Sequence, residues 1–197
     1  EITGCVSEAA AAQCGLCPGT PVSAGMFDVD AAALAMGVID PEPIFMICGT
    51  HGINGYISPR PVTNRTVMLN SLYSLPGAYL IEEGSPSSAG VLEWVIDLLF
   101  DRAGEAPASL YGQVNRMVRE AAGPAGLIFL PYLNGSGDCA LARGAWLGLS
   151  QAHSKGDMLR AVYEGVAFAH RMQIEKLLKN RERPQSLLMA GGATRSE

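Results

Sequence analysis

The chain has 197 residues, of which 48% are hydrophobic, and a formal net charge of −5 from 14 basic and 19 acidic residues. This length is enough for one large domain or two small ones with a substantial core. The acidic balance argues against nucleic acid or an anionic membrane as the main partner, and no apolar stretch approaches the ~20 residues of a membrane-spanning helix.

The first half of the chain predicts short strands and two helices. Its apolar runs are bounded by Gly, Pro, Asn and Asp, which are turn residues, while two alanine-rich stretches favour helix. The expected helices cover residues 6–14 and 30–36, and the expected strands cover residues 22–25, 43–48, 55–58, 66–69 and 78–82.

The second half predicts longer helices that alternate with strands. Apolar residues at spacings of three and four predict a helix over residues 89–100, with the serine hydroxyls of residues 84–88 as its N-terminal caps. Asp157 is expected to cap the last helix. After a polar linker over residues 101–108, the remaining elements are helices at 109–122 and 157–180, strands at 126–130 and 186–190, and a glycine-rich loop at 132–143.

This order of elements indicates an α/β fold with a mixed sheet and helices packed on its faces. The basic residues near the end of the last helix are interpreted as a solvated face. The glycine turn after the final strand normally leads into another element, so we expect these residues to belong to a longer protein. The basic residues are Lys176, Lys179, Arg181 and Arg183.

The cysteines indicate a reduced protein. Only Cys14 and Cys17 form a C-x-x-C pair, and neither a second pair nor a histidine cluster completes a zinc site. No secretory leader is visible, so we interpret the cysteines as ordinary thiols of a reducing cytoplasm. The five are Cys5, Cys14, Cys17, Cys48 and Cys139.

Asp28 is the first candidate functional residue. It ends a run that predicts a strand, a sharp turn and a helix, and a carboxylate at such a point is able to accept a proton. Two interpretations remain open from the residues alone. Asp28 is either a helix N-cap, a role for which Asp30 competes, or part of a functional site.

The second candidate is the turn Gly49-Thr50. Glycine lets backbone N–H groups approach an anion and the threonine hydroxyl adds a donor, although an ordinary turn has the same composition. Neither G-x-x-x-x-G-K-[ST] nor G-x-G-x-x-G after a strand is present, so P-loop and Rossmann sites have no support. The histidines are interpreted as structural or solvated; they are His51, His153 and His170.

A longer pattern adds to these short ones. Residues 144–149 (GAWLGL), then seven residues, then residues 157–164 (DMLRAVYE) resemble the C-terminal signature of the FGGY carbohydrate kinases. Further segments resemble the same family in the same order, so that the resemblance covers essentially the whole chain. They are residues 19–22, 25–34, 49–50, 87–90, 92–94, 129–135 and 191–192.

The resemblance implies a ribonuclease-H-like (actin-like) ATPase lobe. Residues 1–197 would be the C-terminal domain of a kinase whose active site lies in a cleft against an N-terminal lobe. ATP and Mg²⁺ would be its cofactors, a small sugar its substrate and the N-terminal lobe its partner, and a homodimer is compatible with this interpretation. Because half a cleft neither excludes water nor aligns both substrates, the isolated residues are expected to lack kinase activity.

The family's functional positions fall on residues already singled out. Asp28 matches the catalytic base and contacts the substrate, and Val29 matches a second substrate contact. The segment at residues 25–29 is closest to kinases of L-xylulose and related keto-sugars, and no residue is assigned to a metal. The nucleotide positions are Gly49 and Thr50 at the terminal phosphates, Gly135 as a nucleotide contact, Gly191 and Gly192 in the adenosine loop, and Ser196 near adenine.

Two other functions remain open. An actin-like or Hsp70-like ATPase would share the fold, although the signature at residues 144–164 argues against it. A catalytically silent sugar-sensing module would keep the same cleft without turnover.

Overall fold

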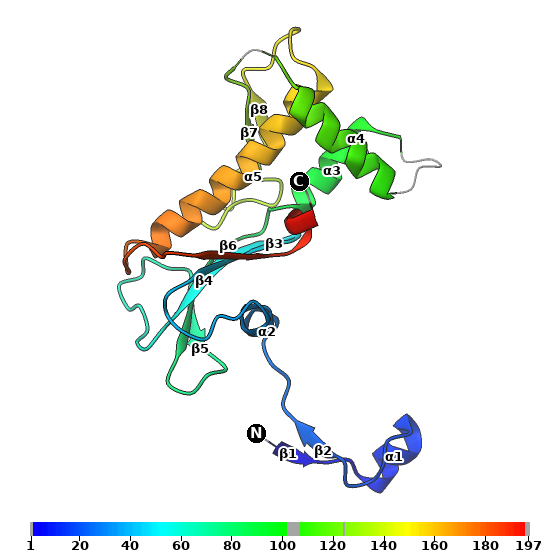
Figure 1. Cartoon of the computed structure of the whole chain (residues 1–197), viewed down its shortest axis with the longest axis vertical. Helices are drawn as coiled ribbons and strands as arrows, with labels where there is room; N and C mark the ends of the chain where they lie inside the picture. Colours follow the sequence, from blue (N-terminus) through cyan, green and yellow to red (C-terminus); the bar gives the residue numbers. More distant parts are fainter. Residues whose placement is uncertain (1, 102–106, 124, 196–197) are drawn as a thin grey trace.

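The computed structural model describes residues 2–101, 107–123 and 125–195. Its centre is a five-stranded sheet in the order β5-β6-β4-β3-β9 (Figure 1). β3 and β9 run parallel and the other neighbours antiparallel, which confirms the predicted mixed sheet. The strands are β3 (Ile44–Cys48), β4 (Gly52–Ser58), β5 (Leu69–Leu72), β6 (Tyr79–Ser85) and β9 (Leu187–Ala190).

The two faces of the sheet pack against two different helices (Figure 1). Successive side chains of a strand point to opposite faces, so each strand contributes to both sides. On one face, α2 (Asp28–Ala35) packs its Ala33 against Leu80. On the other face, the long helix α5 (Lys155–Leu177) packs against the neighbouring Ile81.

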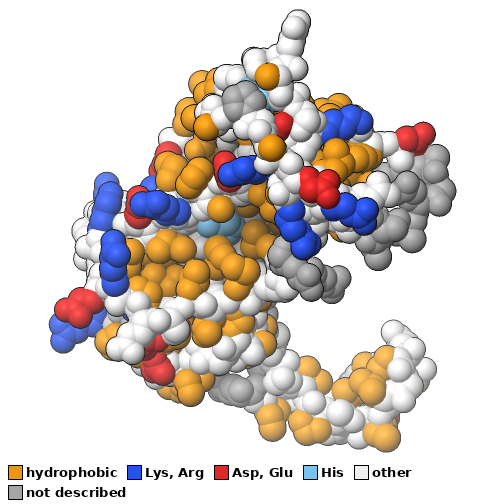
Figure 2. All heavy atoms as spheres, turned by 45° about the horizontal axis from the view of Figure 1, so that its top comes forward, with side chains coloured by type: hydrophobic (Ala, Val, Ile, Leu, Met, Phe, Trp, Pro, Cys, Tyr) orange, Lys and Arg blue, Asp and Glu red, His pale blue; other side chains and the backbone are white. Residues whose placement is uncertain are grey.

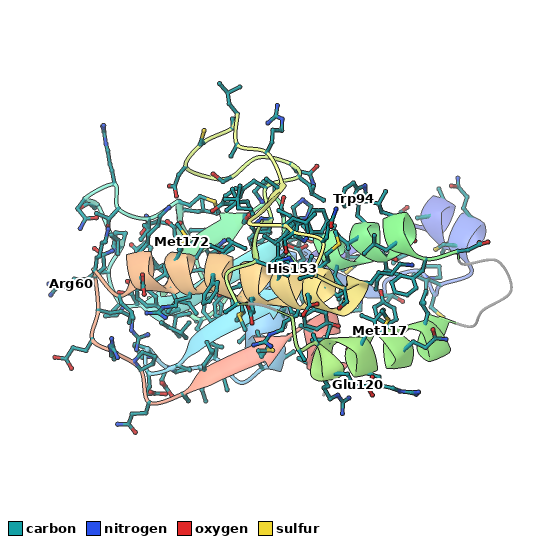
Figure 3. All side chains as sticks on the ribbon, turned by 90° about the horizontal axis from the view of Figure 1, so that it is seen from above. Arg60, Trp94, Met117, Glu120, His153 and Met172 are labelled. Atoms are coloured by element: carbon teal, nitrogen blue, oxygen red, sulfur yellow. The ribbon has the colours of Figure 1, made fainter. Side chains whose placement is uncertain are left out.

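A second layer surrounds the N-terminal half of α5. Seen from above, α3 and α4 lie beside this half of the helix, with the labelled Met117 and Glu120 on α4 (Figure 3). An apolar core joins α3, α4, α5 and a two-stranded hairpin, and it includes the buried Val95, Val114, Phe129 and Leu159. The elements are α3 (Gly90–Leu99), α4 (Pro107–Glu120), β7 (Ile128–Leu130) and β8 (Ala145–Leu147).

The N-terminal residues form an arm that extends away from the sheet (Figure 1). Its strands β1 (Ile2–Cys5) and β2 (Pro21–Ser23) pair antiparallel around α1 (Glu8–Cys14), which ends at Gly15 in the left-handed conformation. Ala11 is the only buried residue among residues 2–28. The 3₁₀ turn η1 (Gly192–Arg195) lies at the other end of the described chain.

Most predicted elements are present, but the strand expected at residues 66–69 is wrong. β5 begins only at Leu69, because residues 64–66 form a turn in which Asn64 accepts from the N–H of Thr66 and Arg65 has a φ of 58°. The strand expected at residues 126–130 covers only Ile128–Leu130, and Ile128 is 53% exposed.

Two predicted caps are wrong, and the N-cap alternative for Asp28 is not what the structure shows. The N-cap of α3 is Ala89, which makes no side-chain hydrogen bond, so the serines before it do not cap the helix. The N-cap of α5 is Ser154, and Asp157 is its capping-box partner at the third helical position. Asp28 is the first residue of α2 rather than its cap, which is Phe27.

The predicted solvated basic face is wrong at two positions. Lys176 pairs with Glu83 at 3.4 Å and also with Asp138. The Arg181 guanidinium lies 4.9 Å from the ring centroid of Tyr56 and donates to the carbonyl oxygen of Pro41. Within the described ranges, no helix combines the length and apolar character needed to cross a bilayer.

Candidate functional site

Two predicted glycine turns meet at one edge of the sheet. Gly49 follows β3 and Gly191 follows β9, and these strands are parallel neighbours, so their carboxyl ends lie side by side. Gly191 has a φ of +103°, and a Cβ at this position would overlap the Cys48 carbonyl oxygen. Such strand ends are where ligands bind in open α/β sheets.

The end of β6 reaches the same edge, because Ser85 pairs with Gly52 at the start of β4. The chain then runs through residues 86–89 into α3. A Cβ on Gly90 would lie 3.1 Å from Cγ2 of Thr50, so the first turn of α3 packs directly on the β3–β4 turn. Because Gly90 has no Cβ, the first turn of α3 is able to pack closely on Thr50 and hold it in place.

A groove opens beside these turns, between the strands β3 and β9 and the helices α3, α4 and α5. Its volume is about 1700 Å³, and both Gly49-Thr50 and Gly192 line it. Figure 2 shows hydrophobic side chains gathered at the centre of one face of the molecule, with charged side chains around them. Tyr111 and Asn115 from α4 form part of the opposite wall.

The loop around Gly135 is tied to the end of β6. The Asn134 N–H donates to Ser87 Oγ at 3.2 Å, and the Asn134 amide donates to the Pro86 carbonyl oxygen at 3.4 Å. Gly135 has a φ of +81°, which favours glycine. This predicted nucleotide position is therefore held against the same sheet edge, although it does not line the groove. The predicted Ser196 lies outside the described residues.

Asp28 and Val29 lie on α2, which covers the face of the sheet opposite α5. Asp28 is exposed, and its Oδ1 accepts from the Val29 N–H at 2.9 Å. The Val29 side chain is 8% exposed and belongs to the core that α2 shares with the sheet. Neither residue lines the groove that contains Gly49, so the structure brings the nucleotide candidates together but leaves Asp28 apart from them.

Glu82 is a buried carboxyl that the sequence analysis missed. It is 1% exposed, and burial raises its pKa to about 7, with further contributions from the negative charges of Asp30 and Asp28. Among the residues that the structure describes, its Oε1 has no hydrogen-bond partner. The same holds for Oδ1 of Asp30, whose other oxygen accepts from Ser74 at 2.7 Å. The sequence did contain a signal for this burial, because two successive glutamates lie in an apolar strand. Successive side chains of a strand point to opposite faces, so the two carboxyl groups face opposite sides of the sheet.

Two further polar residues at this edge escaped the sequence analysis. Ser87 and Ser88 were assigned to helix capping, whereas their hydroxyls bond Asn134 and His170. No group of three or more His, Cys, Asp or Glu side chains among the described residues is arranged to hold a metal ion. The glycine turns and the groove fit a nucleotide, whereas the described side chains do not by themselves form a Mg²⁺ site.

Comparisons with known proteins agree with these features. The sequence model of the "FGGY family of carbohydrate kinases, C-terminal domain" matches residues 44–197. The L-xylulose/3-keto-L-gulonate kinase of Escherichia coli K12 is 30% identical over 203 residues, which cover 100% of this chain and 39% of that protein. The xylulose kinase of the same organism is 29% identical, and the match covers 100% of this chain and 40% of that protein.

Solved structures are similar over the same span. The xylulose kinase of Rhodospirillum rubrum has a TM-score of 0.82 at 32% identity, with 100% of this chain and 40% of that chain covered. The glycerol kinase of Plasmodium falciparum with ADP has a TM-score of 0.76 at 18% identity, with 97% and 38% covered, which is a likeness of fold alone. The chain thus spans about two fifths of the length of these relatives.

Proposed function

This chain belongs to the FGGY family of carbohydrate kinases, whose fold is ribonuclease-H-like (actin-like), and on that premise we propose that it supplies the nucleotide side of an ATP-dependent sugar kinase. The substrate that we propose is a keto-sugar of the xylulose type. The kinases named for L-xylulose or xylulose among its relatives support this choice, as does the short segment at residues 25–29.

The observation that carries the proposal is the pair of glycine turns on adjacent parallel strands. Gly49-Thr50 and Gly191-Gly192 open beside one groove, where an anion is able to approach the backbone of the turns without side-chain obstruction. In the proposal, Gly49 and Thr50 hold the terminal phosphates of ATP. The adenosine part lies toward Gly191 and Gly192, with Gly135 as a further contact and Ser196 beyond the described residues.

Asp28 is the proposed general base. As the sugar hydroxyl oxygen forms its bond to the γ-phosphorus, the bond from that phosphorus to the bridging oxygen of ADP breaks, and the hydroxyl proton passes to the Asp28 carboxylate. One carboxylate oxygen accepts from the Val29 N–H at the start of α2. Val29 is the proposed neighbour of the sugar.

ATP and Mg²⁺ are the proposed cofactors. When bound, Mg²⁺ would neutralise charge on the phosphate oxygens during transfer. We assign it no ligand in this chain, because the described side chains form no cluster for a metal. The role of the described residues is to orient the phosphates at Gly49 and Thr50 and to accept the proton at Asp28.

A second lobe is the proposed partner of this chain. The N-terminal arm exposes apolar side chains such as Ile2, Leu16 and Val22, which a partner surface would bury. The groove and Asp28 are on different sides of the sheet, so a second wall is needed to close a cleft around both substrates. We therefore expect residues 1–197 alone to show no measurable kinase activity.

The test is an assay of the full-length protein that carries this chain, with ATP and a panel of L-xylulose, D-xylulose, gluconate and glycerol. We expect ATP-dependent phosphorylation with a preference for L-xylulose or a related keto-sugar. A clear preference for glycerol would contradict the substrate proposal, and the absence of transfer to any sugar would contradict the kinase itself.

A further inference from the structure

His170 is a buried residue of α5 to which the proposed reaction assigns no role. Its ring is 4% exposed, and both ring nitrogens have partners. Nε2 lies 2.9 Å from Ser88 Oγ, and Nδ1 lies 3.0 Å from the amide nitrogen of Asn54. Asn54 also donates to the side-chain oxygen of Gln173, so that a chain of polar groups links β4, α5 and the loop before α3.

Both ring nitrogens pair with neighbouring side chains in either tautomer of the ring. Nδ1 lies 3.0 Å from the amide nitrogen and 3.2 Å from the amide oxygen of Asn54. Nε2 lies beside the Ser88 hydroxyl, which is able to donate or to accept. Burial lowers the pKa of His170, which favours the neutral ring.

His170 and its partner Ser88 together support both ends of the β3–β4 turn. At one end, a Cβ on Gly52 would lie 2.9 Å from Cε1 of His170 and 3.1 Å from the Ser88 Cβ. At the other end, Sγ of Cys48 lies 3.4 Å from Ser88 Oγ. The residues between these two ends are Gly49, Thr50 and His51, so the turn is bracketed by contacts with His170 and Ser88.

We propose that His170 is a positioning residue that, through Ser88 and Gly52, holds the Gly49-Thr50 turn in the shape that receives the phosphates of the nucleotide. This inference rests on the proposed function of that turn. His170 also lines the groove that Gly49 and Thr50 line. Substitution of the ring removes its packing on Gly52 and takes one hydrogen bond each from the buried Ser88 and Asn54, which is costly.

The test uses the full-length protein and measures two quantities, the affinity for ADP by titration and the KM values for ATP and for the sugar. For His170→Leu we expect ADP affinity to fall about tenfold, equivalent to about 1.4 kcal/mol, with a matching rise in the KM for ATP and little change in the KM for the sugar. His170→Gln keeps a donor on a side chain of similar length and should restore most of the affinity.

Leu177→Ala is the matched control, because Leu177 is fully buried on the same helix but packs away from the turn. It should lower the thermal midpoint without changing ADP affinity. If it weakens ADP binding as much as His170→Leu does, the effect is one of stability and the proposal is wrong. Unchanged ADP affinity in His170→Leu also overturns it.

A second variant tests the same contact more mildly. If His170→Leu fails to fold, Ser88→Ala provides a milder test, since it keeps the ring and removes the hydroxyl that links the ring to Cys48. Unchanged ADP affinity in Ser88→Ala overturns the inference.

If the wild-type protein binds ADP but phosphorylates no sugar, the kinase proposal fails while the affinities still test the role of His170. If it binds no ADP, both fail.

Discussion

Gly191 packs directly against the main chain of Cys48, so that a side chain at position 191 would overlap the Cys48 carbonyl oxygen. The contact joins the end of β9 to the end of β3, where the two glycine turns begin. The spacing of the proposed phosphate and adenosine contacts therefore depends on the absence of a single Cβ.

Gly191→Ala is expected to weaken both folding and nucleotide binding. The residue has a positive φ, which costs about 1–2 kcal/mol for a residue with a Cβ, and the overlap with Cys48 adds to this cost. Gly77→Ala is the control, since Gly77 also has a positive φ of 80° but has open space around it. Thermal unfolding and ADP titration of the two variants should show a loss of affinity only for Gly191→Ala.

Asp28→Ala is expected to lower kcat/KM for the sugar by ~10²–10⁴-fold in the full-length protein, because a general base is lost. ADP affinity should change little, since Asp28 lies apart from the groove. Steady-state kinetics and ADP titration measure the two effects. Asp40→Ala is a control for loss of an exposed carboxylate outside the site. Turnover retained by Asp28→Ala would remove Asp28 from the role of base.

Thr50→Val should mainly weaken nucleotide binding. The hydroxyl is lost while the packing of Cγ2 on Gly90 is kept, so a loss of about 1 kcal/mol, or roughly fivefold in affinity, is expected. Thr20→Val removes a hydroxyl that donates to the Cys17 carbonyl oxygen in the distant arm. ADP titration should distinguish the two variants, and equal affinities would argue against a phosphate contact at Thr50.

Glu82 gives the stability of the protein a defined pH dependence. Its folded-state pKa of about 7 lies above the ordinary value of 4.5, so the folded state binds more protons between these values. This contribution to stability is fully present below pH 4.5 and is lost as the pH rises through 7.

The variant that tests this effect is Glu82→Gln, which is neutral at every pH. Its stability relative to wild type should rise between about pH 4.5 and 7 and then level off, by about 3 kcal/mol at most. Thermal midpoints at several pH values measure the difference. Glu83→Gln is the control on the opposite sheet face; it breaks the pair with Lys176 and should destabilise without this gain. A pH-independent difference for Glu82→Gln would contradict the assignment.

Local sequence identified the turns of the candidate site but not the residues that support them. Gly49-Thr50 and Gly191-Gly192 were found because each follows an apolar strand, and strand ends are a recognisable signal. Ser87 and Ser88 were assigned to capping because a serine before a helix has the same local chemistry whether it caps or bonds elsewhere. Their actual partners, Asn134 and His170, are distant in sequence.

The remaining differences have the same origin. The burial of Glu82 and the neutral state of His170 depend on which face of the sheet each meets, and no local pattern encodes that. The strand expected at residues 66–69 begins only at Leu69. The reason is a turn at Asn64 and Arg65, which the apolar composition of the segment did not reveal. The predicted roles of Asp28 and Val29 stay predictions, since α2 holds them outside the groove.

A crystal structure of the full-length protein with ADP would locate the nucleotide relative to the two glycine turns. We expect the terminal phosphate of ADP within hydrogen-bond reach of Gly49 and Thr50, and the adenosine part beside Gly191 and Gly192 in the groove. ADP bound elsewhere, or phosphates out of reach of the turn that follows β3, would contradict it.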